Sequence, residues 1–271
     1  MVFAWDRLAF ALARTAIWLA RIFALTLFLL PLVVIVLVSV NPNGISPSLT
    51  SGVTFHWFAN VFSVTELMDG LRASLKIALI VTPVSLFIGT CAGYAQWRFR
   101  FIPPRIAETL LSLPILVPLV VTGLALLNTF SKAGMNVGFW NIVIAHVILA
   151  FPFTVRFVLN GLARYDLRLD EAAQSLGADP VKVFWRVTLP LLRPALFAST
   201  LFSFVVSFDD FGVAIFLIDA HTVTLPIAMY QYFEWNVDPT LAALSAMLVG
   251  VALLIAVVCE KTIGLERFVG V

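Results

Sequence analysis

Six long stretches of apolar residues constrain this chain of 271 residues more than any other feature of its sequence. A helix needs about 20 such residues to cross the hydrocarbon core of a bilayer. The stretches that reach or approach this length are residues 22–40, 71–94, 106–130, 139–159, 194–218 and 241–259. Since backbone polar groups must be satisfied within lipid, each stretch is expected to form a helix. We therefore predict an all-α integral membrane protein, with six transmembrane helices in a single domain over residues 1–271.

The composition agrees with lipid as the main solvent of the chain. Charged residues make up 12% of the sequence, against roughly 25% in ordinary soluble chains. The formal net charge is only +2 and forms no basic stripe, so membrane lipid is an expected partner and nucleic acid is not. Cys91 and Cys259 both lie in apolar stretches and indicate no disulfide framework.

The distribution of Lys and Arg predicts how the chain is oriented. With six helices, both termini share one side with the loops after the second and fourth helices. Of the 17 Lys and Arg residues, the opposite side is expected to hold Arg72, Lys76 and Lys132, and the first side holds the rest. Because basic loops stay in the cytoplasm, both termini are predicted to be cytoplasmic. The first stretch is too long for a signal peptide and no A-x-A-like site follows it, so it is expected to be retained.

Prolines and small residues inside the stretches bear on how the helices pack. The prolines are Pro31, Pro83, Pro114, Pro118 and Pro152. Each removes a backbone donor, so these helices either bend around a cavity or show the ordinary proline content of membrane helices. Gly89 and Gly93 form a G-x-x-x-G pattern in the second stretch, which is typical of closely packed helices.

A polar insert over residues 166–190 separates the fourth apolar stretch from the fifth. Its first half predicts a helix whose start can be capped by Asp166 or Asp170, and Gly177 suits a left-handed helix end. The Asp-Pro pair at 179–180 is the usual opening of a new helix, with Asp as the N-cap and Pro in the first turn. The insert is therefore expected to be a helix, a glycine hinge and a second helix, closed by a proline that stops or redirects the chain.

The surface of the insert mixes charged residues with apolar ones. Its larger apolar side chains are Leu176, Val183, Phe184 and Trp185. One interpretation is that the aromatic residues anchor the insert at the membrane interface, where Trp is common. The other is that the insert is a knob that docks into a cytoplasmic protein. The residue types alone favour neither interpretation.

The spacing of residues in the insert resembles the EAA motif of the membrane subunits of ABC importers, E-A-A-x3-G-x9-I-x-L-P. The matching residues are Glu171, Ala172, Ala173, Gly177, Leu189 and Pro190, and Val187 replaces the usual Ile. By this resemblance the matching residues form or support a cytoplasmic coupling helix that docks in a groove of a separate ATPase. The resemblance also implies the type I ABC importer permease fold, with the coupling loop between the fourth and fifth helices.

The resemblance covers most of the chain. Residues 137–162, 207–217 and 225–249 are similar to segments of spermidine/putrescine-type permeases, in particular to the second of the two membrane subunits in such systems. It implies a bacterial inner-membrane assembly with a homologous second permease, two ATPase subunits and a periplasmic or extracellular solute-binding protein. The activity that it implies is import of a small, cationic, polyamine-like solute by alternating access.

The sequence contains no pattern for nucleotide hydrolysis or other catalysis. It has no G-x-x-x-x-G-K-[ST] phosphate loop, so ATP and Mg are expected on the partner ATPase and no cofactor is expected on this chain. It also has no H-E-x-x-H or G-x-S-x-G pattern, and we expect no catalytic or metal site. His56, His146 and His221 are isolated in the sequence and are interpreted as structural or interfacial residues.

The adjacent residues Asp209 and Asp210 lie in the predicted outer half of the fifth stretch. An ionised carboxylate at membrane depth is costly unless it faces water, a partner or a cation. The pair is therefore a candidate binding point for a cationic solute, to which Phe208 and Phe211 could add cation–π contacts. Since helical neighbours diverge by about 100°, one carboxylate is expected to face the cavity and the other a neighbouring helix.

The sequence is also compatible with several other interpretations. The carboxylate pair could make structural contacts with Arg72 or Lys76, near the outer end of the second helix. A permease of the same family could carry another solute, such as an amino-acid derivative, an opine or a phosphonate. A secondary transporter or channel would work without an ATPase. An intramembrane enzyme is disfavoured, because adjacent carboxylates on a helix diverge and do not converge on a substrate.

Overall fold

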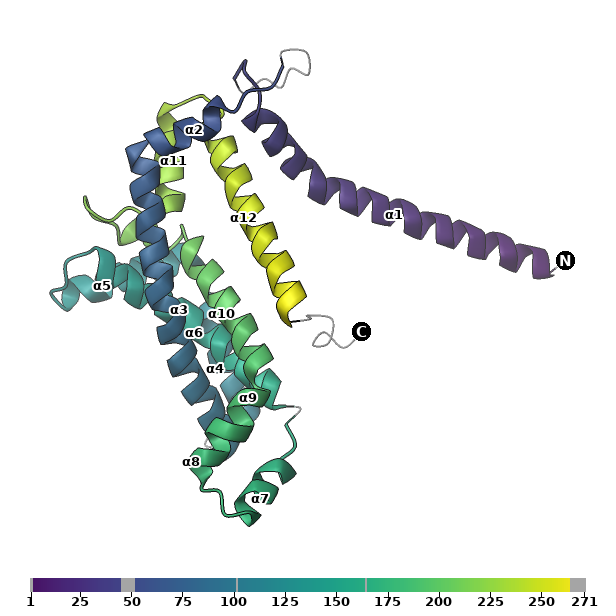
Figure 1. Ribbon diagram of the computed structural model, residues 1–271, viewed down its shortest axis with the longest axis vertical. Helices are drawn as coiled ribbons and strands as arrows, with labels where there is room; N and C mark the ends of the chain where they lie inside the picture. Colours follow the sequence, from purple (N-terminus) through teal and green to yellow (C-terminus); the bar gives the residue numbers. More distant parts are fainter. Residues whose placement is uncertain (1, 45–51, 101, 164, 264–271) are drawn as a thin grey trace. The chain divides into compact units, whose positions relative to one another are not determined.

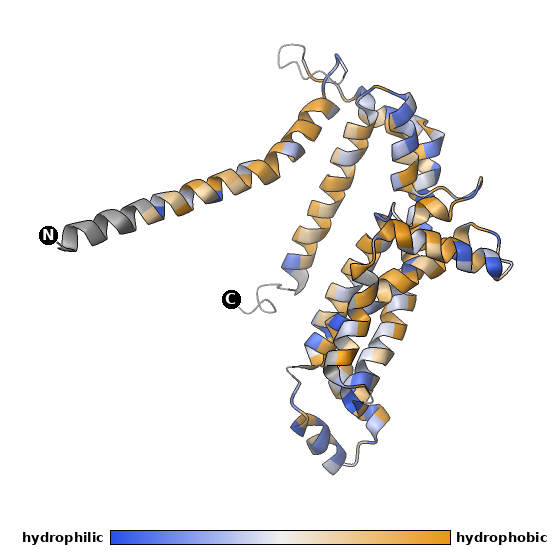
Figure 2. Ribbon diagram, turned by 180° about the vertical axis from the view of Figure 1, so that it is seen from behind, coloured by the Kyte–Doolittle hydropathy of each residue, from blue (hydrophilic) through white to orange (hydrophobic). Residues whose placement is uncertain are grey.

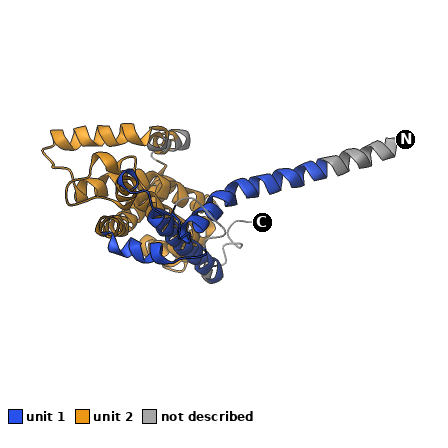
Figure 3. Cartoon of the chain, turned by 90° about the horizontal axis from the view of Figure 1, so that it is seen from above, with its two compact units in different colours: residues 1–64, 233–271 blue, residues 65–232 orange. Residues whose placement is uncertain are grey.

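The computed structural model describes residues 2–44, 52–100, 102–163 and 165–263, and within these ranges the chain is helical with no strand (Figure 1). The predicted all-α class is thus confirmed. The chain divides into two compact units, one made of Met1–Val64 and Phe233–Val271 and the other of Thr65–Tyr232 (Figure 3). Figure 2 shows apolar residues along most helices, whereas hydrophilic residues gather in α7 (Arg168–Ser175) and in the connecting segments.

The first unit holds two of the long apolar helices and one short helix. They are α1 (Val2–Ser39), α12 (Thr240–Ile263) and α2 (His56–Ser63). Both α1 and α2 contact α12. Trp57 of α2 donates its indole N–H to the Asn41 carbonyl at 2.9 Å. Asn60 of α2 donates to the Thr240 hydroxyl at 2.8 Å, so α2 is tied both to the segment after α1 and to the start of α12.

The second unit is built around three helices that pack against one another. They are α3 (Thr65–Phe99), α6 (Phe139–Leu162) and α10 (Arg193–Phe208). Ile77 of α3 is buried in one core with Ile142 and Leu149 of α6. In lipid such contacts depend on close van der Waals fit rather than on the hydrophobic effect. The helix α11 (Leu225–Trp235) begins beside α3, where the Leu225 amide donates to the Ser74 hydroxyl at 2.8 Å.

The third apolar stretch does not form the single helix predicted over residues 106–130. It is divided into α4 (Pro104–Leu116) and α5 (Leu119–Lys132), and Val117 and Pro118 between them are extended. A proline cannot donate a backbone hydrogen bond, and it pushes the residue before it out of the helical region. Pro118 therefore separates two helices, which is a stronger break than a bend within one helix.

The fifth apolar stretch also stops being helical earlier than predicted. The helix α10 ends at Phe208, inside the helix predicted over residues 194–218. Beyond it, the Asp210 carboxylate accepts the amides of Val213 and Ala214, at 3.1 and 2.8 Å, and a short 3-10 turn follows. An aspartate that satisfies nearby backbone amides offers the chain an alternative to continued helix. The apolar pattern of this stretch therefore does not reveal where its helix ends.

Four helices of the described part are long and apolar enough to cross a membrane. They are Ala13–Ser39, Thr65–Phe99, Phe139–Leu162 and Thr240–Lys261. The bent pair formed by Pro180–Leu191 and Arg193–Phe208, with an angle of 68° between its halves, supplies a fifth crossing if it is one span. Several apolar helices thus agree with a multi-pass protein, and the count of six stays a prediction that depends on α4, α5 and α10.

Replacing Gly89 with alanine is expected to loosen the contact between α3 and α6. A Cβ on Gly89 would overlap the side chain of Thr154. Since overpacking costs about 1–3 kcal/mol, Gly89→Ala should lower the melting temperature in detergent by several degrees. Gly250→Ala is the matched control, because no described atom lies within 4 Å of a Cβ at that position of α12. An equal loss in both variants would contradict close helix packing as the cause.

Candidate functional site

Residues 166–190, called the insert loop from here on, contain two short helices joined at a glycine, as predicted. The first helix, α7, ends before Gly177, whose φ of +86° lies in the left-handed region that glycine adopts readily. Asp179 then caps α8 (Pro180–Val183), because its carboxylate accepts the Lys182 amide at 2.9 Å. This hydrogen bond lowers the pKa of Asp179 below its usual value.

In the insert loop the structure selects between alternatives that the sequence left open. Asp166 rather than Asp170 serves the start of α7, where it accepts a backbone amide at 2.9 Å, and Asp170 is buried. Pro190 does not stop the helix, because it lies within α9 (Leu189–Leu191), directly after a π-helical turn. The 68° bend follows at Leu192, between the two halves of the bent pair. A π-helical turn is one of the few local changes that can accommodate a proline within a helix.

The residues of the EAA-like motif differ in their exposure. Glu171, Ala172 and Gly177 are exposed, and Ala173, Leu189 and Pro190 are half-buried. Leu176 and Trp185 also face outward, with 90% and 62% of their surface exposed. Phe184 is instead half-buried, with its ring centroid 4.8 Å from that of Tyr94 in α3. Large apolar side chains that stay exposed beside charged groups indicate a surface that meets a partner or a membrane.

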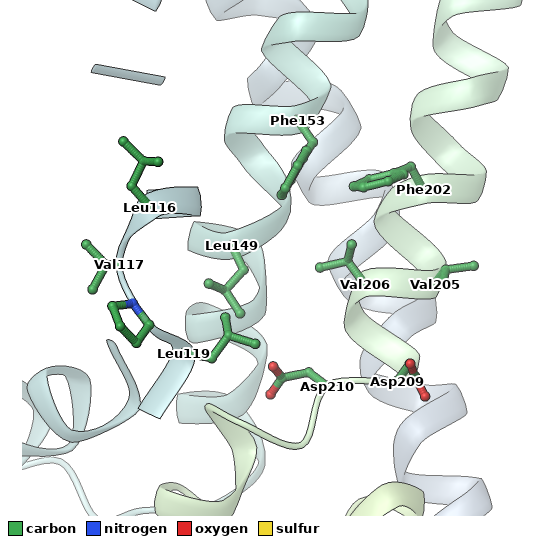
Figure 4. Close-up of a pocket in the computed structure, with 11 residues that line it drawn as sticks. Leu116, Val117, Leu119, Leu149, Phe153, Phe202, Val205, Val206, Asp209 and Asp210 are labelled. Carbon is green, nitrogen blue, oxygen red and sulfur yellow. The ribbon is translucent and has the colours of Figure 1, made fainter. Parts of the chain in front are cut away.

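A cavity of about 590 Å³ lies between α6, α10 and the break at residues 117–118 (Figure 4). Its apolar lining is formed by Leu116, Val117, Pro118, Leu119, Leu149, Phe153, Phe202, Val205 and Val206. Its charged lining comes from Asp209 and Asp210, just after the last residue of α10. Sites for small molecules are usually mostly apolar with a few placed polar groups. This cavity therefore suits a solute with an aliphatic body and a cationic group.

The two carboxylates of the cavity have different surroundings. Asp210 is buried, and one of its oxygens lies 3.3 Å from Nε2 of His146 in α6. That contact lacks the alignment of a hydrogen bond, and Nε2 has no hydrogen-bond partner among the described residues. Nδ1 of His146 lies 3.0 Å from the hydroxyl of Ser207, so one imidazole contacts residues on both sides of Asp209. Asp209 itself is exposed, and no hydrogen bond or ion pair from the described residues reaches its carboxylate.

Several predicted contacts of this carboxylate pair are absent from the described structure. The expectation of a helix through the pair is wrong, because α10 ends before it. Arg72 pairs with an aspartate three residues earlier, at 2.8 Å, rather than with the cavity. Phe208 stacks on Phe204 and Phe211 meets Tyr230 edge-on, and neither is among the lining residues. The aromatic walls are instead Phe153 and Phe202, whose ring centroids are 4.6 Å apart and which the sequence did not single out.

The chain is similar in sequence to one family of transport proteins and to several of its members. Residues 85–259 match the family described as binding-protein-dependent transport system inner membrane component. The spermidine/putrescine transport system permease protein PotC of Haemophilus influenzae is 27% identical over 231 residues, which are 85% of this chain and 90% of that protein. The putrescine transport system permease protein PotI of Escherichia coli is 28% identical over 228 residues, 81% of this chain and 80% of that protein. The putative 2-aminoethylphosphonate transport system permease protein PhnV of Salmonella paratyphi A is 31% identical over 246 residues, 89% and 91% of the two chains.

Solved structures share the fold at lower sequence identity. A bacterial ABC transporter involved in the import of the acidic polysaccharide alginate has a TM-score of 0.69 and 16% identity, over 92% of this chain and 95% of that chain. The MetNI methionine ABC transporter, in an inward-facing conformation, has a TM-score of 0.59 and 20% identity, over 73% and 94% of the two chains. At these identities the likeness concerns the fold alone.

Proposed function

The chain belongs to the family of binding-protein-dependent transport system inner membrane components, and from this membership we propose that it imports a small, cationic, polyamine-like solute. It is a membrane-spanning permease subunit of an ABC importer and not an enzyme, and the ATPase is a separate subunit. The observation that carries this conclusion is the extent of the relationship, since a spermidine/putrescine permease aligns over 85% of the chain.

The proposed assembly lies in the bacterial inner membrane with both termini in the cytoplasm. It contains a homologous second permease, two ATPase subunits that bind ATP and Mg, and a periplasmic or extracellular solute-binding protein. The orientation is supported by the Lys and Arg residues, nearly all of which fall in the termini and in the segments on their side of the membrane. Membrane lipid surrounds the apolar helices, such as α1 and α12 (Figure 2).

The proposed mechanism is alternating access, driven through the insert loop. Glu171 and Ala172, which are exposed on α7, form the part that contacts the ATPase, and the half-buried motif residues support it. The insert loop continues into α10 at Leu192, where the chain bends by 68°, and α9 also contacts α10. Displacement of the loop by ATP-driven closure of the ATPases is therefore passed to α10, and with it to the cavity beside α10. Hydrolysis then resets the permease to its inward-facing state.

The cavity favours a polyamine over the second candidate, an aminophosphonate. That candidate rests on the relative PhnV, which is 31% identical to this chain. Polyamines and 2-aminoethylphosphonate both carry an ammonium group, which the Asp209 carboxylate can attract beside the mostly apolar walls of the cavity. A phosphonate also needs a cation or several N–H donors, as anionic groups generally do. The charged residues that line the cavity are Asp209 and Asp210, both acidic, so its electrostatics suit a solute with positive charge alone.

The test is solute uptake by the complete complex reconstituted in vesicles with ATP available to the ATPases. Labelled putrescine, spermidine and 2-aminoethylphosphonate are each offered with the solute-binding protein present. We expect uptake of at least one polyamine that depends on ATP and is unaffected by excess 2-aminoethylphosphonate. Uptake of the aminophosphonate alone would replace the proposed solute, and uptake without ATP would contradict the importer mechanism itself.

A further inference from the structure

The insert loop contains a buried carboxylate that its surroundings in the sequence do not explain. Asp170 is only 4% exposed, although its neighbours Glu171 and Ala172 in α7 are exposed. Burying a carboxylate is costly unless hydrogen bonds compensate for lost water. The hydrogen-bond partner of Asp170 must therefore offset the free-energy cost of burying this carboxylate.

Tyr165 provides that contact and a second one. Its hydroxyl donates to the Asp170 carboxylate and lies 3.3 Å from the hydroxyl of Thr188. Thr188 is fully buried in the π-helical turn that follows α8. Burial, and then the hydrogen bond to Asp170, raise the pKa of Tyr165 to about 12, so its hydroxyl keeps its proton at physiological pH. One side chain thus contacts the first and the last part of the insert loop.

The ring of Tyr165 connects this contact to α3. It stands edge-on to Trp97, near the end of α3, with the centroids 5.4 Å apart and the planes at 86°. Trp97 contacts Tyr94 at 5.8 Å, and Tyr94 contacts Phe184 of the insert loop at 4.8 Å. Tilted and edge-on pairs at these distances are favourable. The aromatic residues therefore join the end of α3 to Phe184 of the insert loop and to Tyr165, the residue just before that loop.

The opposite end of the insert loop has no such aromatic contact among the described residues, and the backbone hydrogen bonds of Gly177 and Ala178 stay within the end of α7. Gly177 adopts a φ of +86°, and no described atom lies within 4 Å of where a Cβ would stand. Leu176 beside it is 90% exposed. A force applied to α7 can therefore bend the loop about Gly177, unless the base of the loop holds α7 in place.

We propose that Tyr165 is a positioning residue for energy coupling, which locks α7 to the turn at Phe184–Thr188 so that the insert loop moves as one body with the end of α3. This inference rests on the proposed function, in which an ATPase pushes on α7. When the hydrogen bond from Tyr165 to Asp170 is removed, the force from the ATPase bends the loop about Gly177. A smaller displacement is then transmitted to α3 and α10. ATP is then hydrolysed with less transport.

The test is Tyr165→Phe in the complete complex, with its ATPases, second permease and solute-binding protein in vesicles. Phenylalanine keeps the ring contact with Trp97 and removes the hydroxyl. The number of ATP molecules hydrolysed per molecule of polyamine transported should rise about ten-fold, because a hydrogen bond to a charged group contributes at least about this factor to an equilibrium. Asp170→Ala should have the same effect, and the double variant should add little, since both changes remove one interaction.

Tyr94→Phe is the matched control, because it makes the same change in the same aromatic cluster and keeps the ring contacts with Trp97 and Phe184. This variant should hydrolyse as many ATP molecules per transported polyamine as the wild type does. The proposal is overturned if Tyr165→Phe and Asp170→Ala also couple like the wild type. It is equally overturned if they lose the bound ATPase, since Tyr165 would then have only a structural role. Failure of the proposed function is a different result, in which the wild-type complex itself shows no ATP-dependent uptake.

Discussion

Replacing Glu171 with arginine is expected to abolish ATP-driven uptake while the permease stays folded. Glu171 is exposed on α7, so the charge is reversed without disturbing a buried contact, and such surface substitutions change stability little. If Glu171 docks on the ATPase, its carboxylate faces a cationic group there. An arginine would then face that same cationic group, and a contact between like charges costs several kcal/mol. The affinity for the ATPase should therefore fall at least about a hundred-fold. Co-purification of the ATPase with the permease measures this loss.

Glu260→Arg provides the matched control for this charge reversal. Glu260 is also an exposed glutamate in a helix, but it lies near the end of α12 and outside the insert loop. We expect this variant to retain the ATPase and normal uptake. Retention of the ATPase by Glu171→Arg would show that α7 is not the docking surface. Loss in both variants would attribute the effect to net charge and not to the position.

The insert loop was predictable from sequence because its features act locally. A glycine is suited to a left-handed helix end, and the φ of Gly177 shows this conformation. Asp179 caps the helix that begins one residue later, through a hydrogen bond to Lys182 within the same turn. Neither feature depends on a distant part of the chain. Asp170 is instead buried and accepts a hydrogen bond from Tyr165, whose hydroxyl also lies beside Thr188, which explains why its role could not be assigned from helix-capping rules.

The breaks in the third and fifth stretches could not be predicted because they depend on contacts between distant segments. A Cβ on Gly123 of α5 would lie 3.2 Å from Cα of Val213, in the turn after α10. A Cβ on Gly212 of that turn would lie 2.7 Å from the Cβ of Leu119, at the start of α5. The turn that follows the end of α10 thus packs closely against the first half of α5. Hydropathy reports how well residues suit lipid, and it does not detect such a fit.

The candidate solute site was partly accessible from the sequence. The carboxylates Asp209 and Asp210 stood out because ionisable residues are costly in a membrane. A missed signal is the serine repeat of α10, in which Ser199, Ser203 and Ser207 recur every four residues and are buried. This spacing marks one face of a helix, and the last of these serines contacts His146, which also approaches Asp210. The aromatic walls of the cavity could not be found this way, since phenylalanine is frequent throughout the chain.

Replacing Asp209 with asparagine is expected to weaken polyamine uptake about ten-fold to a hundred-fold while the ATPase stays bound. The Asp209 carboxylate is exposed at a cavity with mostly apolar walls, and no described residue neutralises it. A charged hydrogen bond to an ammonium group contributes about 1.5–3 kcal/mol, which corresponds to this range of affinities. The effect should appear as a higher solute concentration for half-maximal uptake. Asp209→Glu keeps the charge and should retain most of the uptake.

Asp210→Asn separates the role of position from the role of charge, because it removes the same charge one residue away. An asparagine oxygen can still accept the amides of Val213 and Ala214, but it places no carboxylate beside His146. The main expected loss is therefore thermal stability in detergent, since a buried contact is broken. Equal weakening of uptake by two equally stable variants would contradict the assignment of the solute contact to Asp209. Unchanged uptake in both would remove the carboxylate pair from the transport path. The cavity would then hold no acidic contact for a cationic solute within the described part of the chain, since no other acidic residue lines it.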